Sequence, residues 1–198
     1  MATSSRLATG LLAVVVGSAA AAGCGMTTAS HSGRDVGPLR GLAGRPAPPG
    51  WRRAELPGDG AVLAYPPGMH PVPGDRGTIS VARFAPAGSY LMYLNATPQQ
   101  GSESLQNWPT FRVSHLLDDD ASSARLLASR RDVLFAGGTG SCVEDVYVTR
   151  VGAHRYTEFA CFVQGRTHAS VIVAAAPTAS WASVSGVLAR SVGAYQVR

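Results

Sequence analysis

Short apolar runs bounded by Gly, Pro and polar residues follow one another along the chain from residue 53 to residue 175, a pattern typical of β-strands. The last three runs lie close together and predict an antiparallel meander at Val143–Thr149, His154–Gln164 and Ala169–Ala175. Earlier strands are predicted at Arg53–Leu56, Ala61–Tyr65, Thr78–Phe84, Tyr90–Leu94 and Arg131–Phe135.

Two segments instead repeat their apolar positions at helical spacing. The first carries the stripe Leu105, Trp108, Phe111 and Leu116, and the second, after Pro177, carries Trp181, Val184, Val187, Leu188 and Val192. The acidic run Asp118–Asp120 favours a third, short helix over Ala121–Leu127, which it would cap. Strands flanked by helices predict an α+β sandwich with an antiparallel sheet.

The first fifty residues have a different character from the rest of the chain. Residues 1–23 combine Arg6, an apolar run from Leu7 to Val16 and several small residues, which is the layout of a secretory signal peptide. Residues 24–50 are rich in Gly, Ser, Thr and Pro and predict a flexible tether. We therefore expect one globular domain over residues 51–198.

Cys24 directly follows Ala21, Ala22 and Gly23, and this arrangement resembles the lipobox of bacterial lipoproteins, although Ala21 stands where Leu is usual. The resemblance implies that Cys24 carries a diacylglyceryl group and palmitate-type acyl chains. The protein would then be anchored to the outer face of the cytoplasmic membrane. The alternative is cleavage by the ordinary signal peptidase, which would release a secreted, soluble protein.

The two remaining cysteines predict a structural disulfide. If Cys24 is lipidated, Cys142 and Cys161 form an even pair in an oxidising compartment. They are placed symmetrically about Val151-Gly152, so a turn centred there puts them directly opposite each other on paired strands.

The same register places Asp145 opposite Glu158 and Tyr147 opposite Tyr156, on the sheet face away from the disulfide. Because like charges in direct opposition are destabilising, a bulge, a slipped register or a counter-ion such as Arg or a metal is expected there. Otherwise the two acids, with His154 on the same face, form a candidate ligand site that shares a proton or binds a cation.

Charge and motifs exclude several function classes. The formal net charge is +5 and all 17 basic residues are Arg, but they form no dense stripe, so we expect no nucleic acid partner. The segment Gly137–Ser141 lacks the Lys of a phosphate loop, and the five His residues are scattered without ligand spacing. We predict no catalytic residues, no metal site and no cofactor.

A set of structural features resembles the PsbP-like fold family. These features are Trp51, the turn Tyr65–Gly68, the helix near Trp108, the turn at Gly137-Gly138 and the helix entry Pro177–Trp181. In actinobacteria this fold is often carried by small lipoproteins of the LpqN type. The composition, with Arg as the only basic residue besides His and with abundant Gly and Ala, is similar to that of proteins from GC-rich genomes. The resemblance covers residues 51–198, brings no catalytic residues, and implies an accessory or binding role in the cell envelope.

Three functions follow as hypotheses. The leading one is a membrane-anchored, non-enzymatic interaction module that binds an envelope protein or a cell-wall component. The second is an envelope enzyme or small-ligand binder that uses the face of Asp145, Tyr147, Tyr156 and Glu158. The third is a structural spacer that binds no ligand.

Overall fold

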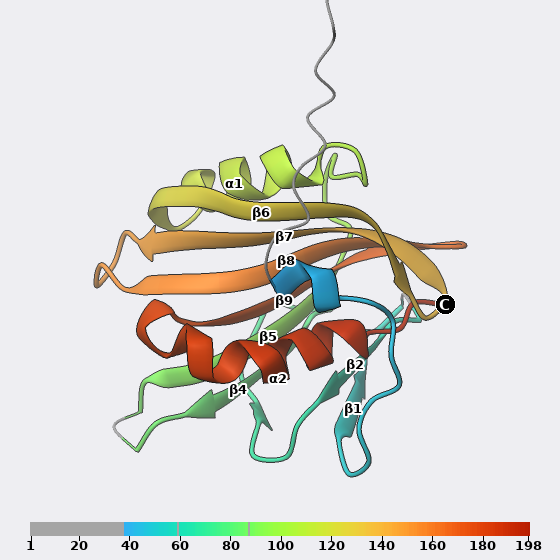
Figure 1. Cartoon of the computed structure of the whole chain (residues 1–198), viewed down its shortest axis with the longest axis horizontal. Coiled ribbons are helices and arrows are strands. Elements are labelled where there is room, and N and C mark those ends of the chain that lie inside the picture. The colour runs from blue at the N-terminus through green and yellow to red at the C-terminus, as the bar shows by residue number, and fades with distance from the viewer. Residues whose placement is uncertain (1–37, 59, 87) are drawn as a thin grey trace, which may run out of the picture. The chain divides into compact units, whose positions relative to one another are not determined.

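The structure is a computed structural model that describes residues 38–58, 60–86 and 88–198 (Figure 1). The predicted signal peptide and Cys24 lie outside the described residues. The elements, in chain order, are a 3₁₀ helix η1 (Pro38–Gly41), β1 (Arg52–Glu55), β2 (Val62–Tyr65), β3 (His70–Pro71), β4 (Ile79–Phe84), β5 (Tyr90–Pro98), α1 (Trp108–Asp118), β6 (Ala121–Phe135), β7 (Gly138–Thr149), β8 (Arg155–Gly165), β9 (Ala169–Pro177), a 3₁₀ helix η2 (Thr178–Ser180) and α2 (Trp181–Gly193).

Seven strands form one antiparallel sheet in the order β3-β4-β5-β9-β8-β7-β6, and β1 and β2 form a separate hairpin. The predicted meander is present as the consecutive pairs β7–β8 and β8–β9. Figure 1 shows α2 running across the near face of the sheet, whereas α1 lies along β6. The α+β sandwich predicted from the sequence is therefore confirmed.

The two faces of the sheet support two separate cores, because neighbouring residues on a strand point to opposite faces. The larger core lies between the sheet and α2, and it contains Cys142, Phe159, Cys161, Ile172, Leu188 and Val192. The smaller core lies between the sheet and α1, and it contains Trp108, Val143, Ala160, Phe162, Val171 and Val173. The small core leaves part of the α1 face of the sheet uncovered, and the candidate site lies there.

The short helix predicted over Ala121–Leu127 is wrong. That segment is the first half of β6, and Asp118 is instead the last residue of α1. Its Leu and Ala residues favour a helix by intrinsic propensity. Pairing with β7, from Ala121 opposite Thr149 to Phe135 opposite Gly138, holds the segment extended and overrides that propensity.

Packing against the domain begins earlier than the predicted boundary at Trp51. Leu39 and Leu42, which fall in the predicted tether, are buried in the larger core. The guanidinium of Arg130 fixes this segment by donating hydrogen bonds to the carbonyl oxygens of Leu39 (2.9 Å), Arg40 (3.1 Å) and Leu42 (2.9 Å). The predicted boundary lies too late in the chain because two apolar side chains are too few to show a periodic pattern.

Within the described part of the chain, no helix has the length and apolar character needed to cross a membrane.

Candidate functional site

The β7–β8 hairpin has the register predicted from the cysteines. Cys142 lies opposite Cys161 with Cα atoms 4.1 Å apart, and the two are joined in a disulfide. The backbone N–H of Thr149 donates to the carbonyl of His154 (2.9 Å), so the loop contains four residues centred on Val151-Gly152. A four-residue loop with the same centre as the predicted two-residue turn pairs the same residues across the two strands. The predicted register is therefore the observed one.

The same register brings the two predicted acids together on the α1 face. Asp145 lies opposite Glu158, and Tyr147 lies opposite Tyr156 with ring centroids 5.7 Å apart. Both carboxylates are completely buried. The pairing is not slipped, so the repulsion between them must be relieved by another group.

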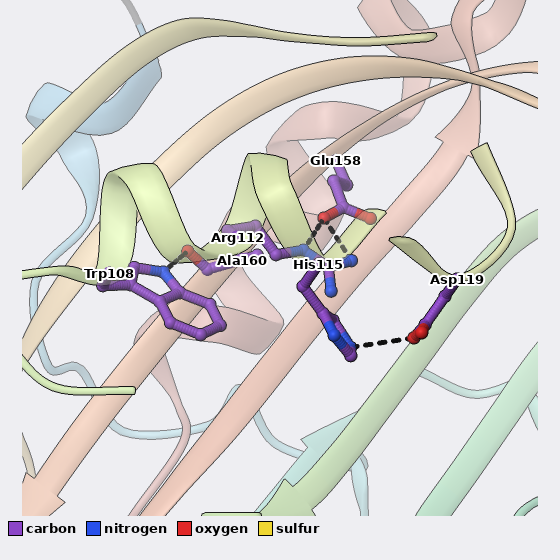
Figure 2. A network of polar contacts seen from close by, with 6 residues as sticks. All are labelled: Trp108, Arg112, His115, Asp119, Glu158 and Ala160. Atoms are coloured by element: carbon purple, nitrogen blue, oxygen red, sulfur yellow. Dashed lines mark hydrogen bonds and ion pairs between the residues drawn. The ribbon is translucent and has the colours of Figure 1, made fainter. Parts of the chain in front are cut away.

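That group is Arg112 of α1. Its Nε donates to Oε1 of Glu158 at 2.7 Å, and its Nη2 lies 2.6 Å from the same oxygen (Figure 2). The Arg112 side chain is 12% exposed and Glu158 is fully buried, so little solvent screens this ion pair. Of the alternatives open at the sequence level, the structure contains the arginine counter-ion.

The position of Arg112 depends on how α1 is attached to the sheet. Trp108, one turn earlier, is buried and donates its indole N–H to the carbonyl of Ala160 on β8 at 3.0 Å (Figure 2). Its ring packs near Phe162, with centroids 6.0 Å apart. Residues four apart share one helix face, so anchoring Trp108 directs Arg112 toward the same strand.

Burial and the Glu158 carboxylate raise the pKa of Asp145 to about 9, although the charge of Arg112 opposes the shift. Burial lowers the pKa of Arg112, but the charges of Glu158 and Asp145 outweigh that effect and raise it overall. Burial also raises the pKa of Tyr147. At neutral pH the cluster therefore contains a protonated Asp145, a neutral Tyr147 and the Arg112–Glu158 ion pair.

Three oxygens in this cluster, Oδ1 and Oδ2 of Asp145 and Oε2 of Glu158, are buried without a hydrogen-bond donor among the described residues. A proton held by Asp145 supplies one donor, because a protonated Asp145 donates to Glu158 and the two acids then share a hydrogen bond. Such unsatisfied buried atoms are uncommon in folded proteins, and they make this cluster a candidate functional site.

A cleft of about 490 Å³ opens above this cluster. Its walls come from α1, the loop before it and the loop containing Asp75, and its floor comes from β5, β9, β8 and β7. Glu158, Arg112 and Tyr147 line it together with Val171 and Val173, so charged and apolar surfaces meet in one concavity.

Tyrosines continue the cleft along the sheet. Tyr93 and Tyr147 line both the cleft and a neighbouring hollow of about 270 Å³, whose other walls include Tyr90 and Tyr156. The Tyr93 hydroxyl is hydrogen bonded to the Ser80 hydroxyl at 3.0 Å, and the Tyr90 and Tyr93 rings lie 5.9 Å apart. The two concavities thus share two aromatic side chains.

The structure brings together four of the five predicted site residues and separates the fifth. Asp145, Tyr147, Tyr156 and Glu158 share the α1 face, whereas His154 lies opposite Thr149 at the end of the hairpin loop and lines a different hollow beside Tyr90. Arg150, near these residues in the sequence, donates instead to the carbonyls of Ala121 and Leu117.

The sequence prediction missed two contributors to the cleft from α1. One is Arg112, which lies four residues after Trp108 and so on the same helix face. The other is the pair His115–Asp119, in which Nε2 lies 3.1 Å from a carboxylate oxygen (Figure 2). The i,i+4 spacing of both pairs was the signal that could have found them.

Comparison with solved structures identifies the fold. The cyanobacterial PsbP protein (CyanoP) of Synechocystis sp. PCC 6803 is 12% identical, covers 75% of this chain and 92% of its own, and has a TM-score of 0.54. LpqN of Mycobacterium tuberculosis, described as involved in cell envelope biogenesis, is 10% identical, covers 74% of this chain and 90% of its own, and has a TM-score of 0.46. No protein-family model and no curated protein matches the sequence.

The likeness to CyanoP shows that the chain has a PsbP-like α+β sandwich fold, as the sequence features predicted. Lipidation, an actinobacterial source and membership of a narrower lipoprotein subfamily stay predictions.

Proposed function

We propose that this protein is an exported, non-enzymatic binding module of the cell envelope, and that it holds its ligand in the cleft between α1 and the sheet. The observation that carries the proposal is the floor of that cleft, where a concavity of about 490 Å³ ends on the buried Arg112–Glu158 pair. Burying charged groups costs free energy, and a core of apolar side chains would pack without that cost. Concave sites that combine apolar walls with a few fixed polar groups are typical of ligand binding.

The arrangement supports binding rather than catalysis. A catalytic acid or base has to come within hydrogen-bond reach of the substrate. Glu158 is already paired with Arg112, Asp145 is not among the residues that line the cleft, and His154 lines a different hollow. The ionisable groups of the floor are therefore suited to fixing a ligand in place.

The proposed location rests on the chain itself. The signal-peptide pattern and the position of Cys24 favour export and lipidation, and the Cys142–Cys161 disulfide is typical of an oxidising compartment. The protein would be held at the outer face of the cytoplasmic membrane by its acyl chains, where an envelope component can reach the cleft.

Site-specific photo-crosslinking in cells tests both parts of the proposal. A photoreactive amino acid replaces Gln100, which is exposed and lines the cleft, or Ser183, which is exposed on α2 and serves as the matched control. We expect a discrete added mass on the protein from position 100 but not from position 183, measured by intact mass spectrometry. Equal adducts at both positions, or none at position 100, would contradict binding in the cleft.

The Cys24→Ala variant of the same protein tests the anchor. We expect the wild-type chain to carry the added mass of a diacylglyceryl group and acyl chains at Cys24 and the variant to carry none, measured by intact mass spectrometry. A wild-type chain without that mass would contradict anchoring through Cys24.

A further inference from the structure

One row of side chains across the sheet identifies a class of ligand. Tyr93, Ala175, Glu158 and Asp145 are aligned across β5, β9, β8 and β7, and of these Tyr93 and Glu158 line the cleft. Ala175 has the smallest side chain of that row and stands between Tyr93 and Glu158. It lines the tyrosine-lined hollow, Glu158 lines the cleft and Tyr93 lines both, so the two concavities meet along this row.

The charges around the cleft favour a cation. Its lining contains four acidic side chains, Asp75, Glu103, Asp119 and Glu158, against the two bases Arg112 and His115. Each base is already paired with one of the acids, Arg112 with Glu158 and His115 with Asp119. Both bases are therefore engaged, and an anionic ligand would meet a surplus of carboxylates.

The hollow also offers what an organic cation needs. Four tyrosines, at positions 90, 93, 147 and 156, line it, and Glu158 is the strand neighbour of Ala175 in its wall. The faces of aromatic rings attract cations, and groups of aromatic side chains recognise organic ammonium ions in this way.

We propose that the tyrosine-lined end of the cleft binds a small organic ammonium group, with Tyr93 and Tyr147 against the cation and the surplus of carboxylates in the cleft lining compensating its charge. This inference rests on the proposed function and specifies its ligand. A metal ion is disfavoured, because no three His, Cys, Asp or Glu side chains of the described residues are grouped to hold one. An organic cation instead uses the apolar and aromatic walls.

Calorimetric titration of the full-length protein in mild detergent tests the inference with choline as the probe. The control ligand is 3,3-dimethylbutan-1-ol, which has the same shape but carries no charge. We expect choline to bind about tenfold more tightly than the neutral compound, since a cation–aromatic contact contributes on the order of 1–2 kcal/mol when desolvated. Equal affinities for the two compounds would overturn the inference.

Two variants of one residue then test the tyrosine wall. Tyr93 is half-buried, so Tyr93→Leu removes the aromatic face with little effect on the core, and Tyr93→Phe keeps the face but loses the hydroxyl bonded to Ser80. We expect choline affinity to fall about tenfold in the Leu variant and to be retained in the Phe variant. Unchanged affinity in a correctly folded Leu variant would contradict the assignment.

The two proposals fail separately. If choline does not bind while crosslinking from position 100 still captures a compound, the ammonium inference is wrong and the binding module stands. If neither gives a signal, both are wrong. Vesicles of phosphatidylcholine that displace bound choline would identify a lipid headgroup as the source of the ammonium, and vesicles without effect would identify a free compound, so either result supports the site.

Discussion

At the scale of single residues, Asp145 is held protonated by its surroundings, and this makes the stability of the protein depend on pH. Its pKa rises from an ordinary 3.8 to about 9 on folding, because of burial and the Glu158 carboxylate. Between those values the folded state holds one proton more than the unfolded state. The free energy of unfolding contributed by this group is therefore greatest below pH 3.8 and falls as pH rises to about 9.

Asp145→Asn removes this dependence, since the amide is neutral at every pH and still donates to Glu158. We expect the variant to be more stable than the unmodified protein at pH 7. The difference should grow by at most about 1.4 kcal/mol per pH unit. Urea unfolding from pH 5 to pH 8 measures it, with the surface variant Asp118→Asn as control. If the free energy of unfolding changed with pH in the same way in the wild-type protein and in Asp145→Asn, the protonated state of Asp145 would be contradicted.

Arg112 is the counter-ion of a carboxylate that has no access to water. Arg112→Met leaves Glu158 buried and unpaired, and we expect it to lower the free energy of unfolding by about 3–5 kcal/mol. The double variant Arg112→Met/Glu158→Gln removes both charges and should recover part of the loss. Denaturant unfolding of the single and double variants forms a double-mutant cycle. Additive losses would show that the two side chains do not interact.

These residues also show which contacts of the site can be predicted from the sequence and which cannot. The opposition of Asp145 and Glu158 follows from counting along one hairpin, because the centre of the connecting turn fixes which residues of the two strands are paired. Arg112 is 46 residues away from Glu158 and reaches it only because Trp108 attaches α1 to β8. The i,i+4 spacing places Arg112 on the helix face of Trp108, but which strand that face meets depends on packing between elements that are far apart in the sequence.

At the scale of elements, the β7–β8 hairpin is stabilised by its own covalent link. The disulfide closes a loop between cysteines 19 positions apart, and in the chain-entropy model such a link contributes about 3 kcal/mol. We expect Cys142→Ala/Cys161→Ala to lose about that much free energy of unfolding. A reductant should lower the stability of the unmodified protein and leave the variant unchanged. Equal stability with and without the disulfide would contradict this account.

Strand β6 shows why an element can be mispredicted. It is an edge strand whose pairing with β7 shifts register at three places, between Ala121 and Ser123, Leu126 and Ala128, and Arg130 and Val133. Each shift interrupts the alternation of inward and outward side chains, so the strand lacks a period of two. Its Ala- and Leu-containing half then has only helix propensity to indicate its structure. The regular strands of the meander, with no such shifts in their pairing, were predicted as strands, although β7 begins at Gly138, five residues before its predicted start at Val143.

At the scale of the whole molecule, residues 38–50 pack against the domain that follows them. Leu39 and Leu42 are almost fully buried, at 3% and 1% exposure, and Arg130 holds their carbonyls. A chain that begins at Trp51 exposes the core surface that these leucines cover. We expect it to be less stable than a chain that begins at residue 33 by at least the 2–5 kcal/mol typical of one buried Leu-to-Ala change, which is about what Leu42→Ala alone should lose.

Urea unfolding of the two chains measures this difference, and hydrogen exchange locates it. Loss of the segment should speed amide exchange at the end of α2 as well, because the N–H of Arg45 donates to the carbonyl of Gly193 (2.8 Å). Equal stability of the two chains would show that residues 38–50 belong to the flexible tether and not to the domain. If the segment is required, the link between the proposed anchor at Cys24 and the domain is shorter than the sequence pattern indicates. The cleft would then be held closer to the membrane surface, where an ammonium-bearing envelope component can reach it.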